Sequence, residues 1–438
     1  FTAVISDLVG NSTTGTASTN IIAVDRVVPE LSTIASSPVS DELSIGETAD
    51  ITFDFSENVT LAGGNLVLSF DTGAEITVTS LSDAVNFTET YTVLADEVSA
   101  DLDVSSVALS AGSLRDAAGN DVTATLLELT LPTGSNLADN SGLVVDGVVP
   151  DIASISSVTT SDSLGIGETI TIDVEFSEAV TLSGGNLFLT LETGDLVADQ
   201  QLEITPFTEQ TIVSVDYIVQ VDHESLDLTV TDIQLPVGTL IDPSGNGVDY
   251  SVPTTTNLAD MNALLVDGIV PDDFTTGDIV TLAAPIVEDY WNLSNTSLEV
   301  IIPVPGISDA SMDGGTTYLE ARVDGNPFVT IGNVTDFGTN PVTMGLDRAD
   351  LETLAGYLAG NTLEVRGVKT DIAGNTTIGA SSSNTLTIDI TAPNVSIVGN
   401  ITAQGGTVIV PGYFNAENTT VLVSTQIAND ASMLNGQI

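Results

Sequence analysis

The chain of 438 residues has no cysteine, one histidine and only six lysines and arginines. Without cysteine it can form neither disulfide bonds nor thiolate metal sites. Against 61 Asp and Glu residues, the six basic residues leave a net charge of −55. Nucleic acids and anionic membrane surfaces are both bound through clustered Lys and Arg, so both kinds of partner are excluded.

Long apolar runs are also missing. No stretch approaches the roughly 18 consecutive apolar residues that indicate a membrane-spanning helix. The first residues, FTAVISDLVG, lack the basic region and apolar core of a signal peptide. The polar residues are mainly Ser, Thr, Asn and Gly rather than Lys. We therefore expect an extracellular or cell-surface protein without membrane insertion.

The chain repeats itself with the period of a whole small domain. An acid followed by a turn and a proline occurs four times, in AVDRVVPE, LVVDGVVPD, LVDGIVPD and TIDITAPN. Asp25, Asp146 and Asp267 are 121 residues apart, and Asp389 follows after 122. Solenoid repeats are roughly 20 to 50 residues long, so this period indicates separate domains instead.

Two successive units share one fold, because residues 44–73 match residues 165–194 almost position for position. In ADITFDF (49–55) and ITIDVEF (170–176) apolar and polar residues alternate, which predicts strands with one buried face. Short strands separated by Gly-Gly-Asn turns predict antiparallel β-sandwiches. A third unit of a second type contains one predicted helix, from Asp347 to about Asn361, with Leu351, Leu354 and Leu358 on one face.

The repeats predict an all-β chain of tandem antiparallel β-sandwich domains arranged as an extended rod. We expect domains over residues 30–149 and 150–270, a domain of the second type over 271–392, and partial domains over 1–29 and 393–438. The partial domains at the ends indicate a window from a longer array. The alternative is a filament subunit whose incomplete ends are completed by strand exchange with neighbouring copies.

These motifs resemble a known family. The pattern IGETITIDVEFSEAVTL…GGNLFLTLETG…DPSGN…LLVDGIVP resembles the bacterial immunoglobulin-like (Ig-like) repeats of very large secreted adhesins and surface proteins. The third unit, with LAGYLAGNTLEVRGVKTDIAGNTT and IDITAP, resembles a related Ig-like variety. The resemblance covers essentially the whole chain and implies Ig-like sandwich rods on bacterial surfaces, often rigidified by calcium near domain junctions.

Two sets of acids recur in register and are our candidate calcium ligands. Together the two sets offer carboxylate, amide and carbonyl oxygens, and a calcium ion binds six to eight such oxygens. The acids before each linker proline are Asp25, Asp146, Asp267 and Asp389. The pairs in the D-x-x-G-N turns are Asp7/Asn11, Asp116/Asn120, Asp242/Asn246 and Asp371/Asn375. Glu57 and Glu178, each at a strand end, are further candidates. The simpler alternative is that Asp and Asn bond only the backbone of their own turns.

Catalysis is not expected, since the chain has no cysteine and no Ser-His-Asp set that is independent of the repeats. Residue type alone leaves a glycosidase-type carboxylate pair open, but an enzyme places its site once, and these acids are repeated. His223 aligns with Glu97 of the preceding unit, so the repeat does not require it, and we interpret it as a surface residue. Lys369, the only lysine, is interpreted as a salt-bridged or surface residue. The expected partners are neighbouring repeats or other copies of the chain. The alternatives are a glycan or cell-surface receptor, and a spacer role beside a secreted enzyme.

Overall fold

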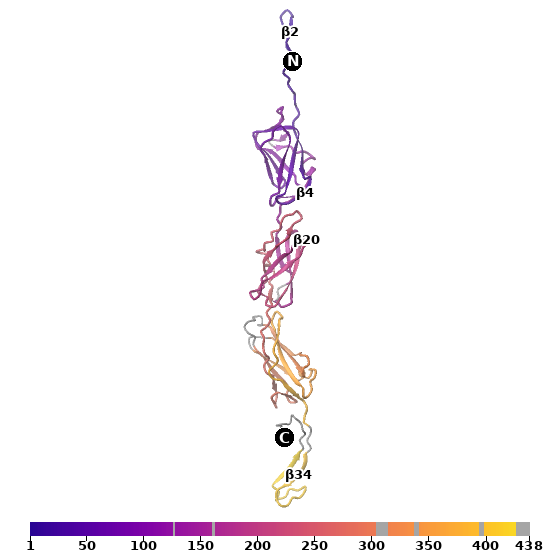
Figure 1. The fold of residues 1–438 in the computed structure, drawn as a ribbon, viewed down its shortest axis with the longest axis vertical. Coiled ribbons are helices and arrows are strands. Elements are labelled where there is room, and N and C mark those ends of the chain that lie inside the picture. The colour runs from indigo at the N-terminus through magenta and orange to yellow at the C-terminus, as the bar shows by residue number, and fades with distance from the viewer. Residues whose placement is uncertain (126–127, 160–162, 304–313, 337–340, 394–397, 426–438) are drawn as a thin grey trace.

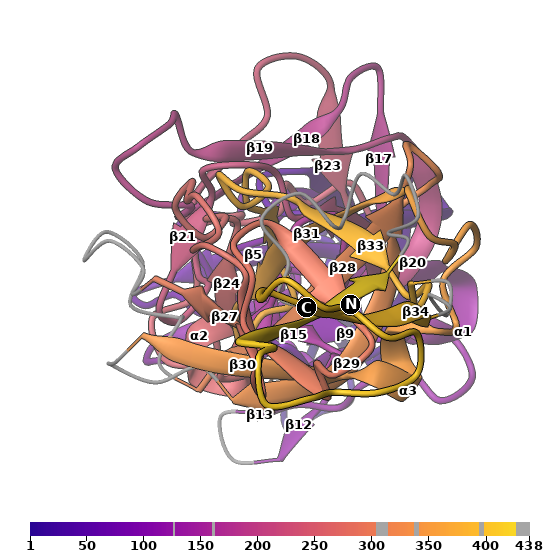
Figure 2. The ribbon, with the colours of Figure 1, turned by 90° about the horizontal axis from the view of Figure 1, so that it is seen from below.

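The computed structural model describes residues 1–125, 128–159, 163–303, 314–336, 341–393 and 398–425. Strands account for 49% of the residues and helices, three of four residues each, for only 3%, which confirms the expected all-β fold. Three bodies follow one another along the longest axis (Figure 1) and lie one behind another when viewed along it (Figure 2). Of the predicted partial domain 393–438, residues 394–397 and 426–438 lie outside the described residues.

Each body has its own hydrophobic core. The three cores are formed by buried residues within 31–145, 152–266 and 279–388. These spans fall inside the segments 30–149, 150–270 and 271–392, which we call domains 1, 2 and 3. The long strand β5 (Thr48–Ala62) shows how the first core forms, because Ile51 and Phe53 are fully buried while the alternating polar residues Asp50, Thr52 and Asp54 are exposed or half-buried.

In domain 1, β5 pairs with β3, β8 and β11, while β10 and β6 lie at the centre of a second sheet. The other elements of this domain are β3 (Leu31–Ser37), β4 (Ser40–Leu43), β6 (Leu66–Phe70), β7 (Glu75–Val78), β8 (Ala84–Thr92), β9 (Val98–Ser99), β10 (Val104–Leu109), β11 (Ser113–Arg115), β12 (Ala124–Thr125), β13 (Glu128–Leu129), α1 (Leu137–Asn140) and β14 (Gly142–Asp146).

Domain 2 repeats this plan around the long strand β17 (Thr169–Ser183), which pairs with β15, β20 and β23. Its other elements are β15 (Ile152–Ser157), β16 (Ser163–Leu164), β18 (Leu187–Leu191), β19 (Gln200–Ile204), β20 (Phe207–Ile218), β21 (Glu224–Ser225), β22 (Val230–Gln234), β23 (Thr239–Ile241), α2 (Leu258–Met261) and β24 (Leu265–Asp267).

Domain 3 has one sheet in the order β25-β27-β30 and a larger sheet in the order β26-β33-β31-β28-β29. Its elements are β25 (Val280–Leu282), β26 (Tyr290–Asn292), β27 (Ser297–Ile302), β28 (Thr316–Val323), β29 (Val329–Asp336), β30 (Val342–Asp347), α3 (Arg348–Leu351), β31 (Thr362–Thr370), β32 (Thr376–Ile378) and β33 (Leu386–Asp389).

The predicted helix of domain 3 is wrong in length. Helix α3 begins after Asp347, as expected, but it ends at Leu351. Further along, Gly356 and Gly360 have φ angles of 86° and 91°, so a right-handed helix could not continue through them to Asn361. Leu358 is therefore 64% exposed rather than part of the buried face.

In each domain a short early strand pairs in parallel with the last strand. The pairs are β4 with β14, β16 with β24 and β26 with β33. In domain 1 this pairing places Val145 opposite Leu43. The linker acid Asp146 and the Ser44–Glu47 turn therefore emerge together at the end of the domain that faces domain 2.

Two smaller sheets precede and follow the three domains. One is the hairpin of β1 (Val4–Ser6) and β2 (Ser12–Thr14), and the other pairs β34 (Val398–Gln404) with β35 (Thr420–Thr425). Their apolar side chains are largely exposed, for example Ile5 and Ile401. None of the helices in the described parts of the chain is long and apolar enough to cross a membrane.

Candidate cation sites at the domain joints

The linker acids define the joints of the chain. We call the joint at Asp25, before domain 1, joint A. Joint B, at Asp146, lies between domains 1 and 2, and joint C, at Asp267, lies between domains 2 and 3. At each joint the D-x-x-G-N loop of the following domain lies next to the linker acid, with Asp116 near Asp25, Asp242 near Asp146 and Asn375 near Asp267.

Three carboxylates from two domains converge at joint B. Asp146 ends β14 of domain 1, Glu178 lies in β17 of domain 2, and Asp242 directly follows β23. One oxygen of each lies within 4.8 Å of the other two. Glu178 Oε1 is buried and has no hydrogen-bond partner. The three carboxylates therefore bring negative charge together, and no Lys or Arg of the described residues forms an ion pair with them.

Joint A has the same arrangement. Asp25, Glu57 and Asp116 each place one carboxylate oxygen within 4.8 Å of the other two. Glu57 Oε1 is buried without a hydrogen-bond partner, like its counterpart at joint B. The repeat therefore builds the same three-acid group twice, from one acid before the linker and two acids after it.

The surroundings of the two glutamates disfavour their charge. Burial is the main reason that the pKa of Glu178 is raised, and the nearby Asp146 and Asp242 raise it further. The pKa of Glu57 is raised by burial and then by Asp25 and Asp116. A bound cation would remove this penalty, because it interacts favourably with the ionised form of all three groups.

The D-x-x-G-N loops are closed by their own hydrogen bonds. In each of the four loops the backbone N–H of Asn donates to Oδ1 of Asp over 2.8 Å. The Asn side-chain Nδ2 donates to the other oxygen of the same carboxylate over 2.7 to 2.9 Å. For Asp116, burial raises the pKa, but the hydrogen bonds from Asn120 and its loop outweigh it and lower the pKa. In the loops of Asp7 and Asp242, Oδ1 also accepts a second backbone N–H, from Val9 and from Gly245. Oδ2 of Asp116 and of Asp242 accepts from the Asn amide and keeps a lone pair for a further partner.

The linker acids use one oxygen for their own turn. Oδ1 of Asp25, of Asp146 and of Asp267 accepts from the backbone N–H two residues later, at 3.0, 3.2 and 3.0 Å. Oδ2 of Asp267 is buried and has no hydrogen-bond partner. Hydrogen bonding within the turn thus accounts for one carboxylate oxygen of each of these three acids. The other oxygen faces the joint.

Joint B contains a fourth acid that the sequence pattern did not indicate. Ser244 Oγ lies 3.0 Å from Glu42 Oε1 and 2.8 Å from Asp146 Oδ2. A hydroxyl has one proton, so it can donate fully to only one of these oxygens. Glu42 breaks the repeat, because the matching residue of domain 2 is Ser163. That departure between twin domains was the available signal.

The remaining predicted ligands are placed differently. At joint C, Asn375 Nδ2 lies 2.8 Å from the Asp267 carbonyl oxygen and 2.9 Å from Asp371 Oδ2, but no three-acid group is found there among the described residues. The Asp7 and Asn11 loop is exposed. Asp389 Oδ1 accepts from Thr391 N over 3.3 Å. Within the described ranges, neither Asp7 nor Asp389 belongs to a three-acid group.

The interpretation of His223 as a surface residue is wrong. His223 is 5% exposed, and its Nδ1 lies 2.8 Å from the hydroxyl of buried Tyr217. In domain 1 the matching Tyr91 donates to Glu97 Oε2 over 2.9 Å. The repeat therefore requires a hydrogen-bond acceptor for a buried tyrosine, and histidine meets this need as glutamate does.

Lys369 is also not a surface residue. Its side chain is fully buried, and Nζ lies 4.2 Å from the centroid of the Phe274 ring. Burial lowers its pKa, while Asp272 acts in the opposite direction. Lys369 lies two positions before Asp371, where domains 1 and 2 have the core leucines Leu114 and Leu240.

The burial of His223 predicts that domain 2 loses stability in acid. Burial lowers the pKa of His223 in the folded state. In the unfolded chain the pKa of histidine is about 6.5. Below this pH the unfolded chain therefore binds a proton that the folded domain does not, so the stability of the domain falls as pH falls. In calorimetry we expect the domain 2 transition to drop more between pH 7.5 and 5.5 than in His223→Gln, which has no proton to gain. Equal drops in both proteins would contradict this.

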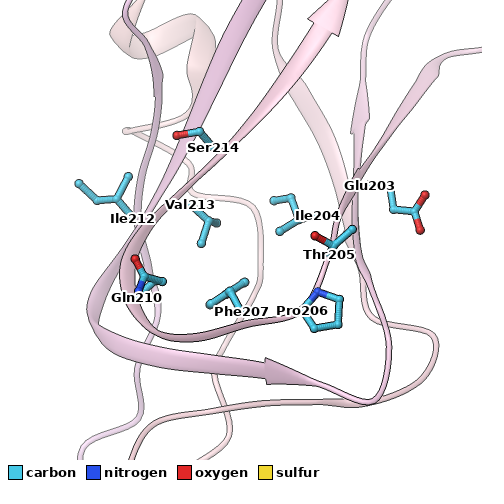
Figure 3. A pocket seen from close by; sticks show the side chains of 9 residues that line it. All are labelled: Glu203, Ile204, Thr205, Pro206, Phe207, Gln210, Ile212, Val213 and Ser214. Carbon is cyan, nitrogen blue, oxygen red and sulfur yellow. The ribbon is translucent and has the colours of Figure 1, made fainter.

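A shallow pocket on domain 2 is another feature of the described residues that could receive a ligand. It has a volume of about 400 Å³ and is lined by residues of β19, β20 and the turn between them (Figure 3). Glu203 is the single ionisable residue among the nine that line it. Glu209, near the start of β20, has a φ of 47°, and its counterpart Asp83 in domain 1 has a φ of 48°, so the two domains share this backbone irregularity.

No protein-family model matches the chain, and no curated protein sequence matches it.

Proposed function

We propose that this chain is a segment of an extracellular rod of tandem Ig-like domains, whose joints are stiffened by bound calcium. The observation that carries the proposal is the repetition of one three-acid group at joints A and B. In both groups the linker acid comes from one side of the joint and the other two acids come from the following domain. An ion held by all three would connect adjacent domains.

The geometry suits calcium. Calcium binds carboxylate, carbonyl and water oxygens at 2.3 to 2.6 Å, so two ligands of one ion lie at most about 5 Å apart. The three oxygens of each group meet this limit, since they lie within 4.8 Å of one another. Asp146, Glu178 and Asp242 would supply three ligands at joint B, and backbone oxygens and water would complete the shell.

The rest of the acidity supports a solvated rod. A few divalent ions neutralise only a small part of the net charge of −55. The remaining carboxylates repel one another and neighbouring rods, which keeps a long chain soluble and unaggregated. The early strand that pairs in parallel with the last strand of each domain supports the Ig-like assignment. A spacing and stiffening role fits chemistry that is repeated rather than placed once.

The test of this proposal compares the whole chain in calcium, in chelator, and in sodium chloride of matched ionic strength. We expect calcium to raise the melting temperature, since an ion at 100 times its Kd stabilises the folded state by about 2.7 kcal/mol. Small-angle scattering should show a longer and less variable maximum dimension with calcium. Identical melting and scattering in calcium and in chelator would contradict the proposal, and an equal effect of sodium chloride would indicate screening alone.

A further inference from the structure

The asparagine of the D-x-x-G-N loop makes contacts that a metal ligand would not need. At joint B, Asn246 is 4% exposed, and its Nδ2 donates to the backbone carbonyl of Asp146 over 3.0 Å. Its Oδ1 accepts from the backbone N–H of Ile45 over 2.9 Å. Both of these partners belong to domain 1. The second hydrogen on Nδ2 is used within the loop, on Asp242 Oδ2.

The same contacts occur at joint C. Asn375 is 5% exposed, and its Nδ2 donates to the Asp267 carbonyl over 2.8 Å. Its Oδ1 accepts from the backbone N–H of Ile166 over 2.8 Å. Domain 3 is of a different type from domain 2, yet its loop binds the preceding domain in the same way. The contact is therefore a property of the joint and not of one domain pair.

We infer that Asn246 and Asn375 are interdomain positioning residues that align joints B and C without a cation. Both hydrogens of each amide are used and its oxygen already accepts a hydrogen bond. A buried amide with all its groups paired holds its neighbours in one arrangement, since displacement would leave polar groups unsatisfied. This role is separate from the calcium site of the proposed function, in which the carboxylates would be the ligands.

The inference also defines the surface that a joint partner must present. The asparagine contacts only backbone groups of the preceding domain, so the side chains of that domain are free to vary. What matters is the turn, in which Ser44 N–H donates to Glu47 Oε2 over 3.0 Å. The Asn292–Asn295 turn of domain 3 has the equivalent bond, over 2.7 Å, and places the N–H of Leu293 in the corresponding position. That end of domain 3 therefore offers the same kind of turn to the D-x-x-G-N loop of a following domain.

The experiment measures the motion of joint B in chelator, using the whole chain. Because the chain has no cysteine, Thr77→Cys in β7 and Gln201→Cys in β19 place spin labels specifically on exposed positions of domains 1 and 2. We expect one narrow interlabel distance in the parent. In Asn246→Ala we expect a broad distribution of interlabel distances instead. The matched control is Asn120→Ala, which removes the same bond within its loop, to Asp116, but is remote from joint B.

A second pair of variants tests the contact from the other side. Ile45 precedes Gly46, which has a φ of 84°, and Glu47 N–H donates to Ser44 O over 3.0 Å, so proline is compatible with this turn position. Ile45→Pro removes the N–H that Asn246 accepts from, whereas Ile45→Ala keeps it. We expect a broad distribution for the first variant and the parental one for the second. Calorimetry would verify that domains 1 and 2 remain folded.

Parental distributions for both Asn246→Ala and Ile45→Pro in chelator would overturn the inference. Asn246→Asp separates a positioning role from a ligand role, because it retains an oxygen but loses the amide donor. If Asn246 were mainly a calcium ligand, this variant would keep the parental distribution in chelator and bind calcium at least as tightly. Broadening in chelator by all three variants, with no calcium effect on the parent, would uphold the inference and reject the proposed calcium role.

Discussion

Glu178→Gln is expected to abolish the calcium response of joint B while raising the stability of the calcium-free chain. With calcium, the variant loses one of three charged ligands. Its affinity should fall by at least the roughly 10- to 100-fold that loss of an outer-shell partner typically costs. Without calcium, the variant removes a partly buried charge whose pKa is raised by burial and by two neighbouring acids. The two effects have opposite signs, which a general loss of folding would not produce.

The matched control is Glu57→Gln, which makes the same change at joint A. Spin labels across joint B should respond to calcium normally in this control. The measurements are calcium titration by calorimetry, melting temperatures with and without calcium, and the interlabel distance. Loss of the response at joint B in both variants would contradict separate local sites. A Glu178→Gln chain that melts lower than the parent in chelator would contradict the repulsion that we infer from the geometry.

Leu319→Ala is expected to lower the free energy of unfolding of domain 3 by about 2 to 5 kcal/mol. Leu319 in β28 is fully buried, so the change leaves a cavity in the third core. Trp291 is the only tryptophan of the chain and belongs to the same core. Its fluorescence in a urea titration therefore reports the unfolding of domain 3 selectively.

The control for this prediction is Leu68→Ala in the first core, at a fully buried position of β6. Since the cores are separate, the tryptophan transition should stay within about 0.5 kcal/mol of the parent. A fluorescence transition that moves equally in both variants would show that the domains unfold as one cooperative unit. That outcome would require the joints to couple the domains far more strongly than a few hydrogen bonds can.

The strands were predictable where side chains alternate over a long stretch. In β17 the buried residues Ile170, Ile172 and Val174 follow the period of two that the sequence shows. The helix at Asp347 was overestimated because Leu351, Leu354 and Leu358 have helical spacing. The positive φ angles of Gly356 and Gly360 are incompatible with the predicted helix through to Asn361, although α3 already ends at Leu351, before either glycine.

The candidate site was predictable only in part. Alignment of the repeats identifies the acids of joints A and B, because each of these acids is repeated in the next unit. The alignment does not show that Asn246 uses its amide to contact domain 1. The sequence D-x-x-G-N is the same whether the Asn amide faces an ion or the backbone of another domain. Glu42 and His223 escaped the repeat pattern because each departs from its twin. Their roles depend on Ser244 and Tyr217, which are distant in sequence.

The parallel pairing within each domain has a mechanical consequence. When the rod is pulled along its axis, force enters domain 1 near β3 and β4 and leaves through β14. Since β4 and β14 run in the same direction, over Ser40–Leu43 and Gly142–Val145, opposite pulls on them slide one strand along the other. Sliding loads their hydrogen bonds simultaneously, whereas peeling would break them one after another. Each domain thus has, beside its core, a short patch built to bear tension in shear between the points where the load enters and leaves.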